Sequence, residues 1–322
     1  MNRRWLLSLF VLAITLEGGV YADDAARSAH IGFLRAEAPD SLFAPFRDGM
    51  RDVGYVEGHN LVIEQRWANG NYADLPQLAH ELVDLKVDVI FATCTVCTTA
   101  ARQATRTIPI VTVSGDPVGM GFVASLSRPG GNVTGLTLLL DELSVKRLEL
   151  LKEMAPGVSR VGVPWVAENP IWKRLISAME RKAPALGMHI EVVKVGGPRQ
   201  IKAALDTLLG RRSDALYIFE DPVLRGESSQ IIAFAVKHHL PAVYGGVEYI
   251  RSGGLVSYAP SFDRLFRMAA GYVAQILAGA KPETMPVQQP TEYELVVNLK
   301  AAKAIGLTIP ESVLLRASEV IR

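Results

Sequence analysis

The stretch "YADLPQLAHELVDLKVDVIFAT" (72–93) holds the helix-and-strand unit from which the fold follows. Leucines recur in it at the spacing of one helical face, at Leu75, Leu78, Leu82 and Leu85. The strand-like run 88–93 follows, and its apolar residues 89–92 are consecutive, without the alternation of a half-exposed strand. A short apolar run beside an amphipathic helix is typical of a parallel strand that helices cover on both faces. The stretch therefore predicts an α/β fold with parallel sheets.

The same alternation of strand and helix continues on both sides of this unit. The strand-like runs of the first series are 30–34, 60–68, 88–93, 108–114 and 131–139. After a helical pattern at 141–154 the series starts again, with strand-like runs at 160–166, 189–195, 215–219 and 241–245. Two such series predict two doubly wound parallel-sheet domains. The alternative is a single eight-stranded barrel, which the restart and the extra C-terminal elements disfavour.

The last part of the chain, 253–322, is less regular and contains two strand patterns among helices. These elements are too few for a third domain, so we expect them to return to the first two. The predicted N-terminal lobe is 30–144 plus about 254–283, and the predicted C-terminal lobe is 145–253 plus about 284–322.

The first residues have the pattern of a cleavable signal peptide. Two arginines precede the apolar run 5–16, and Val20 and Ala22 stand where a signal peptidase reads small residues. An uncleaved membrane anchor is the alternative, but a spanning helix needs about 20 apolar residues. We therefore predict that residues 1–22 are removed on export and that the protein is periplasmic.

Composition and motifs point away from several functional classes. The net charge of the 322-residue chain is +1, and no cluster of Lys and Arg gives the electrostatic footprint of a nucleic-acid-binding protein. The glycine-rich run 128–135 lacks both the dinucleotide and the P-loop spacing. The six histidines are scattered without zinc-ligand spacing, and the sequence has no G-x-S-x-G elbow. We therefore expect no cofactor, no metal site and no enzymatic activity.

Both cysteines of the chain, Cys94 and Cys97, stand in one C-x-x-C motif after the predicted strand 88–93. Such a pair serves as a redox dithiol, as half of a metal site, as a structural disulfide, or as two small residues in a loop. The Thr-Val between the cysteines departs from the Gly-Pro usual in thioredoxin-type proteins. A zinc site would need further ligands at matching spacing, and the sequence has none.

Several long blocks of the sequence are collinear with a known family. They include "VGYVEGHNLVIEQRWANG" (53–70), "ATRTIPIVTVSGDPVGMGFVASLSRPGGNVTG" (104–135) and "MPVQQPTEYELVVNLKAAKAIGLTIPESVLLRASEVI" (285–321). From about residue 31 to residue 322 the chain resembles the ABC-transporter substrate-binding proteins that include tryptophan- and tyrosine-type binders. The resemblance implies a type I periplasmic-binding-protein fold, with two lobes joined by three hinge strands. It also implies a small-molecule ligand trapped on closure and delivery to an ABC permease in the inner membrane.

Ligands of open α/β sheets lie outside the carboxyl ends of the strands, near helix N-termini. The residues that this rule places in a ligand-binding cleft are Leu34, Arg35, Cys94, Thr95, Thr98, Ser114, Asp116, Trp165, Asn169, Glu220, Asp221, Tyr244 and Tyr258. A helix N-terminus with nearby threonine hydroxyls suits a ligand carboxylate.

The remaining side chains of this set have two competing interpretations each. As ligand contacts, the three acidic residues would face a ligand ammonium, and the aromatic residues would stack on an apolar ligand body. As structural residues, Asp116 would form a turn before Pro117, Trp165 would lie in the core, and Tyr258 would pack in a hinge. Arg35 would then be a surface charge.

The leading functional prediction is a monomeric, periplasmic solute-binding component of an ABC importer that captures an amino acid or aromatic carboxylate. The alternative is a periplasmic thiol–disulfide redox protein that uses Cys94 and Cys97. In the resembling family this loop consists of small and hydroxyl residues, so the cysteines are a departure from its pattern. In an oxidising periplasm we expect them to form a disulfide that stiffens the loop.

Overall fold

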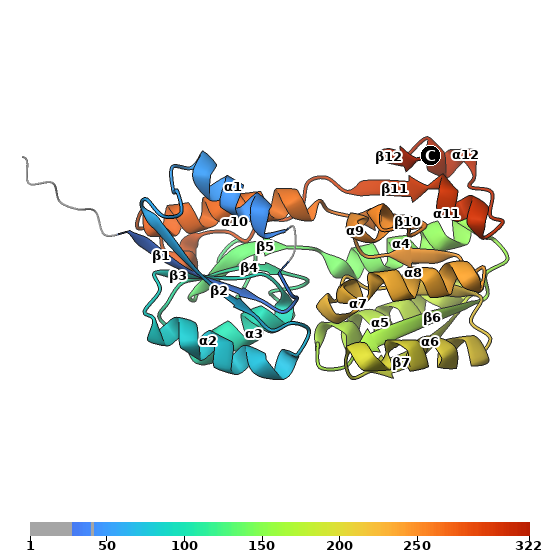
Figure 1. Ribbon diagram of the computed structural model, residues 1–322, viewed down its shortest axis with the longest axis horizontal. Helices are drawn as coiled ribbons and strands as arrows, with labels where there is room; N and C mark the ends of the chain where they lie inside the picture. The colour runs from blue at the N-terminus through green and yellow to red at the C-terminus, as the bar shows by residue number, and fades with distance from the viewer. Residues whose placement is uncertain (1–27, 40–41) are drawn as a thin grey trace, which may run out of the picture.

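The computed structural model describes residues 28–39 and 42–322, which form two lobes, each built on its own sheet (Figure 1). The predicted signal peptide, 1–22, lies outside the described residues. Among the residues that are described, no helix combines the length and the apolarity that a membrane crossing requires.

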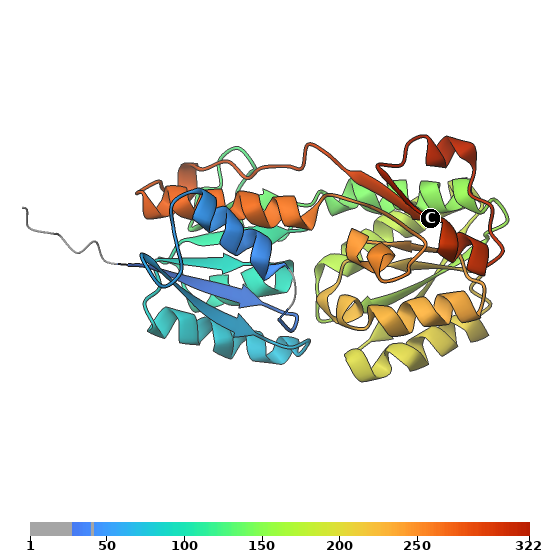
Figure 2. The ribbon, with the colours of Figure 1, turned by 45° about the horizontal axis from the view of Figure 1, so that its top comes forward.

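The first lobe contains a parallel five-stranded sheet in the order β2-β1-β3-β4-β5. Its strands are β1 (Ala29–Arg35), β2 (Leu61–Trp67), β3 (Val89–Ala92), β4 (Ile110–Ser114) and β5 (Val133–Thr137). The helices packed on it are α1 (Phe43–Asp52), α2 (Leu75–Asp84), α3 (Thr95–Ala104) and α10 (Phe262–Leu277), with the short η1 (Tyr72–Asp74) before α2. Helices α2 and α3 cover one face of the sheet, and α1 and α10 cover the other (Figures 1 and 2).

The second lobe contains a seven-stranded sheet in the order β12-β11-β10-β9-β8-β6-β7, with one antiparallel pair, β10 and β11. Its strands are β6 (Arg160–Val166), β7 (His189–Val195), β8 (Ala215–Ile218), β9 (Ala242–Tyr244), β10 (Val256–Ala259), β11 (Glu294–Asn298) and β12 (Glu319–Ile321). The other elements are α4 (Leu140–Met154), α5 (Ile171–Lys182), η2 (Ala183–Leu186), η3 (Pro198–Gln200), α6 (Ile201–Gly210), α7 (Pro222–Gly226), α8 (Ser228–Lys237), α9 (Val247–Arg251), α11 (Leu299–Ala304) and α12 (Glu311–Leu314). Two separate sheets confirm the predicted fold class and exclude the barrel.

Within the described residues the chain crosses between the lobes three times, before α4, before α10 and before β11 (Figure 2). The boundaries differ from the predicted ones. Strand β10 was expected in the first lobe but pairs with β9 and β11, so the return begins only with α10. Helix α4 already packs on α5 of the second lobe. The segment after η4 (Pro282–Thr284) stays beside the first sheet, where Gln288 bridges to Leu136 of β5.

Aromatic side chains fix α10 in the first lobe, although it follows the second lobe in sequence. The ring of Phe91 on β3 lies 4.7 Å from that of Phe46 on α1 and 5.3 Å from that of Phe266 on α10, between centroids. Such pairs contribute about 1 kcal/mol each beyond the area they bury. Phe266 and Phe262, one turn apart near the start of α10, are thereby held at the edge that faces the second lobe.

Candidate ligand-binding cleft

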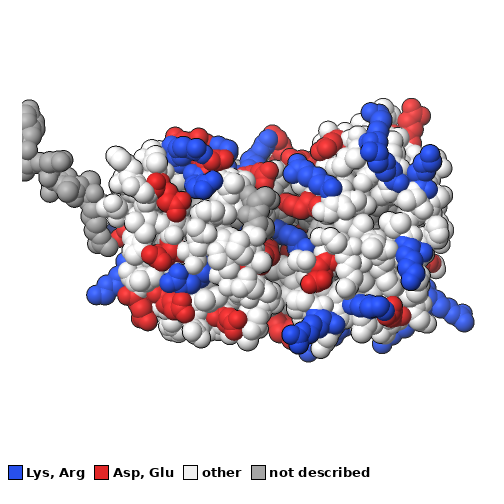
Figure 3. Space-filling model, in the orientation of Figure 1, with Lys and Arg blue, Asp and Glu red and all other residues white. Residues whose placement is uncertain are grey.

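A furrow separates the two lobes on the surface (Figure 3), and beneath it lies a cavity to which both lobes contribute. The lining residues from the first lobe and its connections are Arg35, Glu37, Thr93, Cys94, Thr95, Val113, Gly115, Leu138, Phe262 and Phe266. Those from the second lobe are Leu140, Asn169, Trp172, Glu220, Pro222 and Arg225. The void has a volume of about 30 Å³, which is room for one or two water molecules. A larger molecule can enter only if the lobes move apart.

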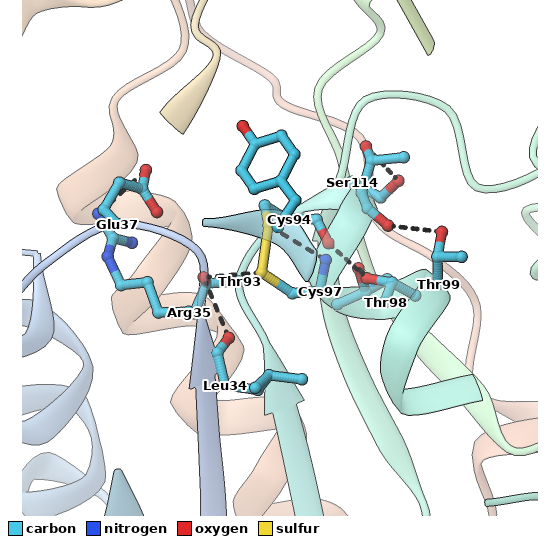
Figure 4. The surroundings of a disulfide bond; sticks show 12 residues. Leu34, Arg35, Glu37, Thr93, Cys94, Cys97, Thr98, Thr99 and Ser114 are labelled. Atoms are coloured by element: carbon cyan, nitrogen blue, oxygen red, sulfur yellow. Dashed lines mark hydrogen bonds and ion pairs between the residues drawn. A yellow bond between two sulfur atoms is a disulfide. The ribbon is translucent and has the colours of Figure 1, made fainter. Parts of the chain in front are cut away.

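The first wall of the cavity is built around the N-terminus of α3. Cys94 caps this helix, because its sulfur accepts the backbone N–H of Cys97 at 3.3 Å, and the two cysteines form a disulfide. The hydroxyl of Thr95 lies 3.3 Å from that of Ser114 and accepts the N–H of Gly115. Figure 4 shows the disulfide with Ser114 nearby and with Glu37, which lies two residues beyond the end of β1. The wall therefore presents a helix N-terminus, where an anion is favoured.

Three predicted residues of the first lobe lie behind this wall and do not line the cavity. Thr98 is fully buried, and its hydroxyl donates to the Cys94 carbonyl at 2.8 Å and meets the Thr112 hydroxyl at 2.5 Å. Leu34 belongs to the core, where its carbonyl accepts the N–H of Thr93. Ser114 is fully buried against Thr95. Thr98 therefore fastens α3 to the sheet instead of facing the cavity.

The Glu37 carboxylate lies in the cavity lining between two guanidinium groups, one from each lobe. Oε1 of Glu37 lies 3.5 Å from Arg35 of the first lobe and 3.6 Å from Arg225 of the second. Each arginine also covers a ring of α10, Arg35 over Phe266 and Arg225 over Phe262. Arg35, for which a surface position was the alternative, is thus buried and lines the cavity.

In the second wall, Asp221 is fully buried and accepts a hydrogen bond from each of its neighbours. The donors are the Tyr72 hydroxyl at 2.8 Å, the Trp172 indole N–H at 2.6 Å, the Asn169 amide at 3.1 Å and the Val223 backbone N–H at 2.9 Å. Burial raises the pKa of Asp221, and the hydrogen bonds from Trp172, Tyr72 and Asn169 oppose that shift. All four partners donate, so the group serves as an ionised acceptor that organises this wall.

Glu220 lines the cavity, but both of its oxygens are bonded to Arg147 on α4, at 2.9 and 3.2 Å. Arg147 also donates to the carbonyls of Tyr258 and Gly245. Burial alone lowers the pKa of Arg147, but the charges and hydrogen bonds of Glu220 and Tyr217 together outweigh this effect and raise it. The pair thus ties the cavity wall to β10, the strand that leads into the second crossing.

Polar contacts join the two lobes across the cleft at separate points. The hydroxyl of Tyr72 reaches Asp221, Glu37 reaches Arg225, and Asp116 pairs with Arg174 on α5. Asp116 also accepts the N–H of Gly119, so it forms the turn that was its structural alternative. At Gly115 the lobes touch closely, since a Cβ there would overlap Ile171 and Leu140. The two lobes are therefore closed against each other in this structure.

The predicted aromatic residues lie away from the cavity. Trp165 on β6 packs against the hydrophobic core. Tyr244, at the end of β9, is buried and stacks on Tyr249 with ring centroids 5.1 Å apart. Tyr258 on β10 lines a separate groove of the second lobe, beside Tyr293. Of the predicted set, the cavity brings together Arg35, Cys94, Thr95, Asn169 and Glu220.

Several cavity residues were not in the predicted set, notably Glu37, Trp172, Arg225, Phe262 and Phe266. Glu37 stands only two residues beyond Arg35, and Trp172 lies in the first turn of the helix after β6, so a wider window at each strand end would have included both. The two phenylalanines have no such signal, because α10 reaches the cleft only through the return of the chain to the first lobe.

Similarity to known proteins agrees with this architecture. The family of ABC transporter substrate binding proteins matches residues 29–321. The chain belongs to this family. The tyrosine-binding protein of Clostridioides difficile is 27% identical over 289 residues, which are 88% of this chain and 83% of that protein. A conserved domain protein from Vibrio cholerae, 29% identical, superposes with a TM-score of 0.85 over 91% of this chain and 100% of its own.

Two further relatives, each 25% identical to this chain, were solved in different states, one with L-Trp and one ligand-free and open. Their similarity to this chain therefore indicates how its lobes are arranged. A domain from Streptococcus pneumonia in complex with L-Trp gives a TM-score of 0.83, covering 91% of this chain and 100% of its own. The ligand-free, open structure of a substrate-binding protein from Clostridium difficile gives only 0.64, with coverage of 90% and 98%. At equal identity, the lobes of this family member are placed more as in the L-Trp complex than as in the open structure.

Proposed function

We propose that this protein is the periplasmic solute-binding component of an ABC importer. It captures an amino acid or small aromatic carboxylate between its lobes and delivers it to an inner-membrane permease, as a monomer and without catalysing a reaction. The observation that carries this proposal is the cavity lined from both lobes, closed by contacts that only approaching lobes can make. An amino acid is favoured by the relatives described as tyrosine-binding and as complexed with L-Trp.

Each part of such a ligand has a counterpart in the cleft. The N-terminus of α3, at Cys94 and Thr95, suits the carboxylate. Trp172, Phe262 and Phe266 offer apolar surface to the remainder of the molecule. Closure would then seal the ligand through the Tyr72–Asp221 and Glu37–Arg225 contacts.

A thermal-shift panel on the exported chain, residues 23–322, tests the proposal. It contains the twenty L-amino acids, aromatic carboxylates without an amino group, and neutral sugars as controls. A ligand at 100 times its Kd stabilises the folded state by about 2.7 kcal/mol, so we expect at least one amino acid or aromatic carboxylate to raise Tm by about 5 °C or more. Stabilisation by sugars alone, or by no compound, would overturn the proposal.

Export and delivery need separate measurements. Intact-mass analysis of periplasmic protein should give a chain that begins at Asp23. Addition of the loaded protein to the cognate permease in proteoliposomes should stimulate ligand uptake and ATP hydrolysis. A chain that retains residues 1–22, or a permease that does not respond, would contradict the importer role.

The disulfide favours one second candidate function, thiol–disulfide exchange. Cys94 borders the cavity and lies at a helix N-terminus, which is where reactive thiolates are stabilised. Insulin reduction by the wild-type protein, lost in Cys94→Ser/Cys97→Ser, would support this function. The binding proposal expects no insulin reduction, and it expects the double variant still to respond to the stabilising compound.

A further inference from the structure

The cavity contains two buried oxygen atoms that accept no hydrogen bond from any described residue. They are Oε2 of Glu37 and Oδ1 of Asn169. Glu37 enters the cavity from the first lobe and Asn169 from the second, and their exposed fractions are 8% and 2%. Buried acceptors in folded proteins nearly always have a partner, because an unpaired one costs about 1–3 kcal/mol. Two such atoms beside one void are therefore suited to a donor that the described residues do not supply.

The orientation of the Asn169 amide is set by its neighbour. Its Nδ2 donates to Asp221, and a carboxylate with three other donors can only accept there. The Asn169 oxygen must then point away from Asp221. In the same way, Oε1 of Glu37 faces Arg35 and Arg225, which leaves Oε2 as the oxygen without a partner among the described residues.

The other acidic groups in or behind the cavity wall already have partners on both carboxylate oxygens. Glu220 is bonded through both oxygens to Arg147, and Asp221 already accepts from its neighbours on both oxygens. Among the buried side-chain oxygens that line this cavity, only those of Glu37 and Asn169 lack a hydrogen-bond partner in the described part of the chain, so a cationic donor has acceptors there. A negative carboxylate together with an amide oxygen suits an ammonium group better than a neutral donor.

We propose that Glu37 and Asn169 form an ammonium-binding subsite, so that the protein takes zwitterionic α-amino acids in preference to the corresponding carboxylic acids. This inference rests on the proposed function and narrows it, since an aromatic carboxylate without an amine satisfies neither oxygen. The two poles of the ligand would lie on different groups, with the carboxylate at the N-terminus of α3 and the ammonium between the lobes. Because the two acceptors come from different lobes, the ammonium also links them on closure.

Matched ligand pairs test the subsite. Each stabilising L-amino acid is compared by titration calorimetry with the acid that lacks its α-amino group, for example L-tryptophan with indole-3-propionate or L-leucine with 4-methylpentanoate. Hydrogen bonds to charged groups correspond to about 10- to 100-fold in affinity, so we expect the amino acid to bind at least tenfold more tightly. Glu37→Gln should reduce this ratio about tenfold, and Asn169→Leu should reduce it in the same direction.

The ratio separates a ligand contact from a structural effect. Glu37→Gln also weakens the contacts with Arg35 and Arg225, but that loss lowers the affinity for both members of a pair equally. Glu57→Gln, at an exposed position of the same lobe, is the matched control and should leave the ratio unchanged. Equal binding of amino acid and deaminated acid by the wild type, or a ratio that Glu37→Gln does not move, would overturn the subsite but leave the proposed function intact. Absence of binding by every amino acid and carboxylate would remove both.

Discussion

The two walls of the cleft differ in what their polar groups are bonded to. In the first wall, beside the α3 N-terminus, Glu37 retains an oxygen without a hydrogen-bond partner among the described residues. In the second wall, Asn169 likewise retains an unpaired oxygen among the described residues, but the charged groups, Glu220 and Asp221, are saturated by Arg147, Tyr72, Trp172 and their neighbours.

This difference separates groups that can meet a ligand from groups that hold the wall in place. A carboxylate at a strand end is chemically suited to bind an ammonium, yet a fully bonded carboxylate gains little from a new partner. Glu220 and Asp221 therefore hold the wall in position, whereas Glu37 and Asn169 are the groups that we propose contact the ligand.

Arg147→Met should lower the free energy of unfolding through the second wall, and this is the largest of the expected effects. It leaves the Glu220 carboxylate buried without its partner, and such a loss costs about 3–5 kcal/mol of folding free energy. The double variant Arg147→Met/Glu220→Leu should cost much less, because no unpaired charge remains. Urea unfolding measures both. Equal losses would mean that Glu220 does not depend on Arg147, and its assignment to positioning would be wrong.

Gly115→Ala should obstruct closure where the walls meet. Its Cβ would overlap Ile171 and Leu140, and overpacking of this kind costs about 2 kcal/mol, or roughly 30-fold in affinity for the best amino acid of the panel. Gly131→Ala is the control, since a Cβ at Gly131 meets no atom within 4 Å. Unchanged affinity in Gly115→Ala, measured by calorimetry, would show that the ligand-bound lobes stay farther apart than in the structure.

Tyr72→Phe should also lower the ligand affinity, but by less than Gly115→Ala. It removes the hydrogen bond from the first lobe to Asp221, which is worth about 1.5 kcal/mol and therefore about tenfold in affinity. Tyr55→Phe, in the turn before β2, serves as the control and should bind as the wild type does. If the two variants bind equally well, the Tyr72–Asp221 contact does not contribute to the ligand-bound state.

Alkaline pH should act on the second wall through its buried tyrosines. Burial raises the pKa of Tyr217 to about 12, from a model-peptide value of 10.0, and the nearby Arg147 opposes the shift. The folded state therefore retains a proton that the unfolded chain loses above pH 10, so stability is intact below pH 10 and falls as pH rises toward 12. Tyr217 alone should account for about 1 kcal/mol at pH 11. Urea midpoints between pH 8 and 11 measure this decline, and a constant midpoint would contradict the buried position.

The sequence specified the fold class well because strand and helix periodicity is a local signal. Leu75, Leu82 and the run 88–93 become α2 and β3 as predicted. The membership of β10 could not be inferred in this way, because a strand of four residues pairs with whichever sheet edge the tertiary structure brings to it. The lobe boundaries were correspondingly misplaced near residues 140 and 254.

The cavity was only partly predictable, for a related reason. The strand-end rule located Cys94, Thr95 and Asn169, since it depends on sheet topology alone. It could not show that Asp221 is saturated by Tyr72, because that hydroxyl comes from 149 positions away and from the other lobe. Which acceptor remains unpaired is a property of the assembled walls.

Closure of the lobes on an amino acid is the central claim, and small-angle X-ray scattering tests it most directly. The chain without the predicted signal peptide, residues 23–322, is measured alone and with a saturating concentration of the L-amino acid that gives the largest thermal shift. We expect a smaller radius of gyration in the bound sample, with scattering that fits the closed lobes of this structure. A radius of gyration that does not change at saturation would contradict it.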